Sequence, residues 1–335
     1  MAGYHRVGVV AELPATLLAL GVDPKPVIAA VGLPPDLLRN PDNMIAFADL
    51  GRLLEAAVAA SGCAHLGIHV GLRGGLASLG LVGRLMATAP TVREAILDLC
   101  INQVRYIQGA VSYLTVLDGV GQWGYSVQAP RLPGIAAIMD AAVGIGDRCI
   151  HQLSGHRPET VWLSRTVPAD PTPYHRGFGV APRFDAEQTC VVLGPGALAA
   201  PVRTADPVLR RILQRQVAAY WARAQPSVAE QVRRAVAAQL TTGEASLERV
   251  AERLDLGPRT VNRRLRAEGS SFRAVLDQAR NDVACQLLGG TRMPITDISG
   301  ALGYATPPGF VRAFRRMNGQ TPTEWRRGQL TTEAA

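Results

Sequence analysis

A chain of 335 residues with 47% hydrophobic side chains can form two domains with their own cores, and this content excludes a chain that is disordered throughout. Thirty-five basic residues outweigh 27 acidic ones, for a net charge of +8, and every basic residue except Lys25 is an arginine. Residues 226–330 contain 16 arginines and 10 acidic residues, so six of the eight net charges belong to the final third. This distribution predicts a polyanionic partner for that part of the chain.

The five cysteines are widely spaced and form no metal-ligand pattern, so we expect buried, reduced thiols. Glu12 and Pro14 interrupt the apolar stretch that a secretory signal would need. No apolar run without charges reaches the roughly 18 residues of a membrane span. The sequence therefore predicts a cytoplasmic protein with no membrane partner.

The first third of the chain has the apolar spacing of helices. The expected helices cover 13–20, a short stretch from 23, another from 36, then 45–60, 76–87 and 91–106. Thr91 and Glu94 form a predicted capping box at the start of the last of these. Residues 71–75, Gly-Leu-Arg-Gly-Gly, are expected to form a flexible loop or hinge.

The hydrophobic period then changes to that of strands. Strands are expected over 110–117, 122–127, 159–163, 181–184 and 189–193, with a long helix over 132–153. Asp118 and Gly119 predict a hairpin turn between the first two strands. Residues 1–205 are thus predicted to be an α+β domain, followed by a linker over 206–226. A helix over 208–222 would serve this linker or a dimer interface.

Two helix-turn-helix patterns occupy residues 227–330. In the first, Ser246 caps a short apolar helix, and a second helix begins at Pro258 and stops at Gly269. Val261 and Leu265 face inward from this arginine-rich helix, as a DNA-reading helix requires. A long helix over 271–288 leads to a second unit over 295–304 and 310–319, and a last short helix follows Thr321. This predicts an all-α C-terminal domain with two helix-turn-helix units joined by a long helix.

The tandem unit resembles the DNA-binding domain of the AraC/XylS family of bacterial transcription regulators. Matching positions include Arg-Thr-Val-Asn-Arg-Arg-Leu at 259–265, Glu-Gly-Ser-Ser-Phe at 268–272, Phe-Val-Arg-Ala-Phe at 310–314, and Trp325. Residues 1–205 are similar to the arabinose-binding-type sensor domain of one branch of that family, through the motifs at 79–83 and 174–184.

The resemblance implies that the two exposed helices enter successive major grooves, about 34 Å apart. Arg259, Asn262 and Arg263 would then read bases, because Arg can pair bidentately with guanine and Asn with adenine. Arg264 and Arg266 would contact phosphates or flank the core. The expected DNA-binding residues are Arg259, Thr260, Asn262, Arg263, Arg264, Arg266, Thr306, Arg312, Arg315 and Arg316.

The second unit departs from the family pattern at the start of its exposed helix. Pro307, Pro308 and Gly309 stand where relatives usually offer polar side chains, and none of the three can hydrogen-bond a base edge through a side chain. We therefore expect this helix to dock on the DNA backbone and to read little sequence.

Other candidate sites are less specific. Arg105, Tyr106, Trp123 and Tyr125 could line an effector pocket, although residues at such spacing also build ordinary core. His65 and His69 are spaced i and i+4, but no acidic general base lies between them, so no metal site is expected. No phosphate-binding loop, dinucleotide fingerprint or nucleophile elbow occurs, so we expect neither an enzyme nor a cofactor.

The sequence thus predicts a DNA-binding transcriptional regulator that is controlled by a small-molecule effector in its N-terminal domain. The alternative is a DNA-binding regulator whose N-terminal domain only oligomerises; an enzyme fused to a DNA-binding module is disfavoured. The expected partners are double-stranded promoter DNA, an effector, a second copy of the chain and, for an activator, RNA polymerase.

Overall fold

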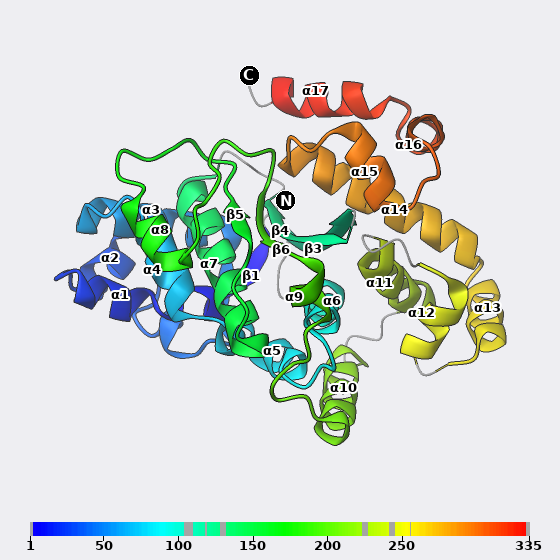
Figure 1. The fold of residues 1–335 in the computed structure, drawn as a ribbon, viewed down its shortest axis with the longest axis horizontal. Helices are drawn as coiled ribbons and strands as arrows, with labels where there is room; N and C mark the ends of the chain where they lie inside the picture. The colour runs from blue at the N-terminus through cyan, green and yellow to red at the C-terminus, as the bar shows by residue number, and fades with distance from the viewer. Residues whose placement is uncertain are drawn as a thin grey trace. The chain divides into compact units, whose positions relative to one another are not determined.

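The computed structural model describes residues 3–103, 110–117, 119–127, 132–222, 227–240, 245–254 and 256–332. By its contacts the chain divides into two compact units, Met1–Ser112 with Gly119–Val217 and Tyr113–Asp118 with Ala218–Ala335. Helices and strands mix up to residue 199, and every described element from Pro207 onward is a helix (Figure 1). This order of elements confirms the predicted fold class.

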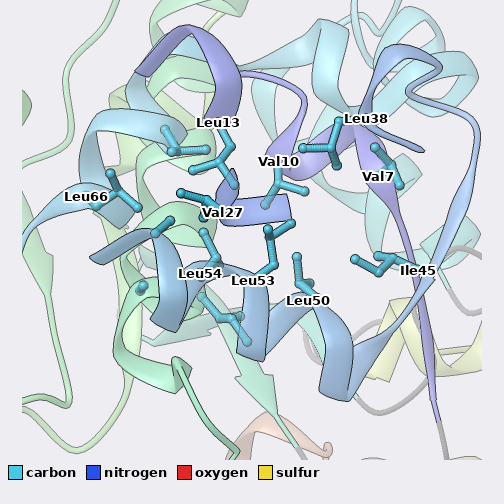
Figure 2. Packing of buried hydrophobic residues seen from close by; sticks show 14 of the residues in the cluster. Val7, Val10, Leu13, Val27, Leu38, Ile45, Leu50, Leu53, Leu54 and Leu66 are labelled. Atoms are coloured by element: carbon cyan, nitrogen blue, oxygen red, sulfur yellow. The ribbon is translucent and has the colours of Figure 1, made fainter. Parts of the chain in front are cut away.

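The N-terminal third of the chain consists mainly of helices. They are α1 (Leu13–Ala19), α2 (Pro24–Ala30), α3 (Phe47–Ser61), α4 (Leu66–Arg73), α5 (Gly80–Met86) and α6 (Val92–Asn102), with 3-10 turns η1 (Val7–Val10), η2 (Leu37–Arg39) and η3 (Leu76–Leu79). Leu50, Leu53 and Leu54 of α3 are buried in a cluster with Val10 and Leu13 (Figure 2). The helical spacing of these leucines gives α3 the continuous apolar face that the core requires.

Two of the predicted helix starts are confirmed in detail by their caps. The Asp23 carboxylate accepts a hydrogen bond from the Lys25 backbone N–H at 3.0 Å at the start of α2. The Thr91 hydroxyl accepts one from the Glu94 backbone N–H at 3.3 Å at the start of α6. Each side chain satisfies a backbone donor that the first helical turn leaves free.

The predicted helix over 45–60 is wrong at its start, because a short strand comes first. Strand β2 (Met44–Ala46) pairs antiparallel with β1 (Tyr4–Arg6), with Ile45 opposite His5, and α3 begins only at Phe47. This pairing joins segments about 40 residues apart. The local spacing of hydrophobic residues does not reveal a strand partner that is so distant in the sequence.

The prediction of a flexible loop over 71–75 is also wrong, because Gly71 lies inside α4. A Cβ atom on Gly67 or Gly71 would lie 2.3 or 2.4 Å from the carbonyl oxygen of Ala137 or Ala141, both on helix α7 (Ile135–Ser154). The two glycines therefore let the backbones of α4 and α7 approach closely. Only Gly74 and Gly75 lie beyond the helix.

A four-stranded sheet follows, in the order β3-β4-β6-β5. Its strands are β3 (Ala110–Leu117), β4 (Val120–Val127), β5 (Thr160–Trp162) and β6 (Thr189–Leu193). β6 pairs antiparallel with both β4 and β5, with Val191 opposite Trp123 and Val161. Of the expected hairpin turn, Asp118 lies outside the described residues and Gly119 has φ +82°.

The predicted strand over 181–184 is wrong, because Arg183 forms only an isolated bridge to Trp162. The sequence also gave no sign of helix α8 (Thr172–Phe178), whose Tyr174 and Phe178 are fully buried, or of the short helix α9 (Pro195–Ala199).

The remaining helices are α10 (Pro207–Ala222), α11 (Val228–Leu240), α12 (Leu247–Arg253), α13 (Pro258–Ala267), α14 (Phe272–Gly290), α15 (Ile295–Ala301), α16 (Pro307–Asn318) and α17 (Pro322–Thr332). Helix α11 was not predicted; it packs against α14, and its Val232, Ala235 and Val236 are buried.

Among the described helices none is by itself long and apolar enough to cross a membrane. Only α3 and α4 together meet that criterion, and they are bent by 113° relative to each other.

Candidate nucleic-acid interface and ligand cavity

The first helix-turn-helix unit has the local structure that its sequence predicts. The Ser246 hydroxyl accepts a hydrogen bond from the Arg249 backbone N–H at 3.3 Å and so caps α12. Gly257 is the extended N-cap of α13, with Pro258 at the first helical position. Val261 and Leu265 are fully buried on the inner face of α13.

The outer face of α13 presents four arginines. Arg259, Arg263, Arg264 and Arg266 are exposed, and none of them pairs with a residue in the described part of the chain. Thr260 and Asn262 are half-buried. An unpaired cationic face on a helix supported from behind can contact phosphates and base edges.

The second unit presents a different surface. The Thr306 hydroxyl accepts a hydrogen bond from the Gly309 backbone N–H at 3.3 Å, so it caps α16, and Pro307 and Pro308 form the first turn. Arg312, Arg315 and Arg316 are exposed further along this helix. The Arg316 guanidinium also lies 3.5 Å from the Asp277 carboxylate of α14.

Polar and aromatic contacts hold the second unit together. The Arg280 guanidinium of α14 donates to the carbonyls of Leu302 and Gly303, at 3.0 and 3.2 Å, and its centre lies 4.9 Å from the Tyr304 ring. These carbonyls end α15, where a cation complements the helix dipole. Successive rings of Tyr304, Phe310, Phe314 and Trp325 then lie 5.4 to 5.8 Å apart.

A contact that sequence reasoning missed joins α13 to α11. The two carboxylate oxygens of Glu268 accept hydrogen bonds from the backbone N–H groups of Val228 and Ala229, at 2.7 and 2.8 Å. Glu268 thereby caps a helix 40 residues away, and no local pattern marks such a contact.

A cavity lies in the first unit between its helices and its sheet. The empty space is about 730 Å³, including the part that opens to solvent. Most of its lining is apolar and includes Leu50, Leu54, Leu99, Ile138, Ala141, Ala142, Ile145 and Val191. The polar lining residues are His5, Ser112, Tyr125 and Thr189, and no Asp, Glu, Lys or Arg is among the described residues that line it.

Two of the four predicted effector residues, Trp123 and Tyr125 of β4, line this cavity. The Trp123 indole N–H donates to the Ser112 hydroxyl at 2.8 Å. Burial raises the pKa of the Tyr125 hydroxyl well above its ordinary value, so this group is a neutral hydrogen-bonding group. The other two predicted residues, Arg105 and Tyr106, lie outside the described residues.

His5 was missed by sequence reasoning, because only the β1–β2 pairing brings it to the cavity. Its Nδ1 donates to the Arg6 carbonyl at 2.9 Å, and burial lowers its pKa to about 4. The imidazole is therefore neutral at pH 7, and with Nδ1 protonated its Nε2 is an acceptor.

The N-terminal residues 21–202 match the model of the arabinose-binding domain of AraC transcription regulators, and residues 250–328 match a helix-turn-helix domain. The chain is 26% identical to the HTH-type transcriptional regulator VirS of Mycobacterium tuberculosis over 313 residues, which cover 92% of each protein. It is 26% identical to an ornithine utilization regulator of Pseudomonas aeruginosa over 314 residues, 91% of each. These relatives are regulators and not enzymes.

A solved structure, the transcriptional regulator CdpR of Pseudomonas aeruginosa, is 22% identical, with 91% of this chain and 96% of that chain covered and a TM-score of 0.43. The two domain matches together explain the cavity-bearing first unit and the tandem helix-turn-helix unit. The chain belongs to the AraC family of transcription regulators, with an arabinose-binding-type N-terminal domain and a helix-turn-helix DNA-binding domain.

Proposed function

We propose that this regulator binds promoter DNA through α13 and α16 and responds to an uncharged, largely apolar effector in the cavity of its first unit. The observation that carries the effector assignment is the lining of that cavity, which is apolar except for four neutral polar residues. An effector that binds one arrangement of the regulator better than another shifts the population toward it.

The lining also constrains the chemistry of the effector. An amino acid such as ornithine carries several charges, and burying a charge without a partner is costly. With no charged side chain among the described lining residues, a compound of that kind is disfavoured here. A neutral molecule with one or two hydrogen-bonding groups fits His5, Ser112 and the Tyr125 hydroxyl.

On DNA, eight of the ten residues predicted from the sequence divide between two roles. Arg259, Asn262 and Arg263 read bases in one major groove, and Arg264 and Arg266 contact phosphates. The exposed arginines of α16 dock on the backbone in the next groove. The exposed arginines of α13, which pair with no described residue, support this division, as does the capping of α16 by Thr306 and two prolines.

A homodimer is part of the proposal, and α10 offers a surface for it. Val208, Leu209 and Ile212 are 67%, 44% and 48% exposed, whereas Leu213 and Val217 of the same helix are buried. Neighbouring exposed apolar side chains on one helix suit contact with a second copy. An activator would also contact RNA polymerase, and a chromosomal target places the protein in the cytoplasm.

A thermal-shift screen of the full-length protein with uncharged apolar compounds tests the effector site. A ligand present at 100 times its Kd stabilises the folded state by about 2.7 kcal/mol. Gly146 lines the cavity, and a Cβ there would lie 3.3 Å from Val191 and 3.7 Å from Trp123, so Gly146→Leu fills space that the effector needs. We expect this variant to lose the shift that wild type shows.

The matched control is Gly196→Leu, because nothing lies within 4 Å of a Cβ at Gly196. An equal shift in wild type and Gly146→Leu would place the ligand elsewhere. No shift with any compound, in a protein that still dimerises and binds DNA, would favour the alternative in which the first unit only oligomerises.

Light scattering tests the dimer interface. Ile212→Glu should lower the measured mass, whereas the control Gln216→Glu should leave it unchanged. An unchanged mass for Ile212→Glu would exclude α10 as the interface.

A further inference from the structure

Three metal-ligating side chains meet at the turn between α3 and α4. One ligand atom from each of Cys63, His65 and His69 lies within 4.8 Å of the other two. The two imidazole rings are in contact, with their centroids 5.0 Å apart. These residues lie outside the cavity and the DNA-binding helices, and nothing in the proposed function uses them.

Local backbone structure accounts for the cluster. Gly62 adopts a left-handed conformation, with φ +63°, that ends α3 and redirects the chain. The Leu66 N–H donates to the Cys63 carbonyl at 3.1 Å, which closes a tight turn ahead of α4. His65 is the N-cap residue of α4, and His69 lies one helical turn later on the same face.

The ligand set is chemically specific. A thiolate together with two imidazoles suits Zn²⁺ or Cu⁺, whereas Mg²⁺ and Ca²⁺ prefer oxygen. With Zn–S and Zn–N bonds of about 2.3 and 2.0 Å, ligand atoms around a tetrahedral ion lie roughly 3.5 Å apart. A separation below 4.8 Å therefore closes by small side-chain rotations.

Burial also suits an ion site. The Cys63 side chain is buried, at 7% exposure, and both histidines are half-buried. The sulfur is thus shielded while the imidazoles keep a path to solvent. The histidine pair without a glutamate between them gave no reason to expect a metal in the sequence; the structure adds the third ligand from the preceding turn.

We propose that Cys63, His65 and His69 bind one thiophilic metal ion, Zn²⁺ or Cu⁺, at the start of α4. The Cys63 thiol gives its proton to solvent as the sulfur binds, and a fourth position stays open for water or another ligand. The site belongs to the helix whose Gly67 and Gly71 pack against α7, and Ala141 of α7 lines the cavity. A bound ion would therefore stabilise α4, which packs against the cavity-lining helix α7.

Metal titration of the reduced full-length protein, with its affinity tag removed, tests this proposal. Zn²⁺ affinity is measured against a chromophoric chelator, Cu⁺ affinity against a Cu⁺-specific chelator, and native mass spectrometry gives the stoichiometry. Co²⁺ serves as the spectroscopic probe, because a sulfur ligand produces a thiolate-to-cobalt absorption band. We expect one ion per chain and a Co²⁺ band that Cys63→Ser abolishes.

Each of Cys63→Ser, His65→Asn and His69→Asn should weaken binding more than about a hundredfold, since even outer-shell partners change affinity 10- to 100-fold. Matched controls are Cys285→Ser and His156→Asn, which lie outside the cluster and should bind as wild type does. Because Cys63 is buried, the two histidine variants carry the test if Cys63→Ser fails to fold. A wild type that binds no ion, a Co²⁺ spectrum without a thiolate band, or equal affinity in cluster and control variants would each overturn the proposal.

Discussion

The ion pair between α10 and α6 offers a sharp test of how the first unit is built. The Arg210 guanidinium forms a two-point contact with the Asp98 carboxylate, with Nη1–Oδ2 and Nη2–Oδ1 distances of 2.7 and 3.1 Å. The side chains are only 14% and 3% exposed. The next residue of α6, Leu99, lines the cavity, so this pair connects the linker helix to the cavity wall.

Arg210→Met should destabilise the attachment of α10 by about 3 kcal/mol. Removing one partner of a buried ion pair costs about 3–5 kcal/mol, because the remaining charge stays buried without its counterion. Asp98 takes part in further interactions, so we expect the lower end of that range. Replacing both residues, as Asp98→Leu with Arg210→Met, removes the stranded charge and should recover much of the loss.

Hydrogen–deuterium exchange of the full-length protein measures this effect locally, which suits a chain of two units better than one global unfolding curve. About 3 kcal/mol corresponds to exchange of the first turns of α10 that is roughly a hundredfold faster. Arg211→Met is the control, since Arg211 is exposed and such substitutions usually change stability by less than about 0.5 kcal/mol. Equal exchange in the Arg210 and Arg211 variants, or a double variant less stable than Arg210→Met, would refute the reasoning.

Two further predictions concern DNA recognition and pH. Arg263→Ala should weaken DNA binding by about 1–3 kcal/mol and relax the preference at one base position. Changing each base of the half-site under α16 should alter affinity little. Mobility-shift titrations measure both, and unchanged binding by Arg263→Ala, or a strong base preference under α16, would contradict these predictions. Burial raises the pKa of Asp140 from 3.8 to about 6, against the opposing effect of Arg165, so the folded protein keeps this proton over a range in which the unfolded chain has lost it. Stability should therefore fall by at most roughly 3 kcal/mol as the pH rises from about 4 to about 6. Urea midpoints should show a smaller decline for Asp140→Asn, and parallel pH profiles for wild type and variant would show that Asp140 is not responsible.

The buried carboxylate behind this pH prediction was not visible in the sequence. Asp140 lies in the apolar stretch of α7, and its Oδ2 accepts hydrogen bonds from Arg165 and from the Tyr174 hydroxyl, both at 2.6 Å. Its other oxygen, Oδ1, has no partner in the described structure, which accords with the raised pKa. The three residues come from separate segments, so only the fold brings them together.

The helix-turn-helix units and the helix caps at Ser246, Thr91 and Asp23 could be predicted from the sequence. Caps, turns and apolar stripes depend on residues within four positions of one another, so a linear reading captures them. The exposed arginines of α13 were visible for the same reason, since the buried positions Val261 and Leu265 fix which face of the helix points outward.

Features that join distant segments could not be predicted from the sequence and required the folded structure. From the sequence Gly71 is expected in a hinge, but in the structure it lies in α4 and packs against the carbonyl of Ala141. His5 reaches the cavity only because its strand pairs with the strand of Ile45. The cavity likewise needs the sheet and α7 to face each other. Such contacts form when separate elements pack together. Their stabilising interactions therefore join residues that are distant in the sequence, and no local pattern reveals them.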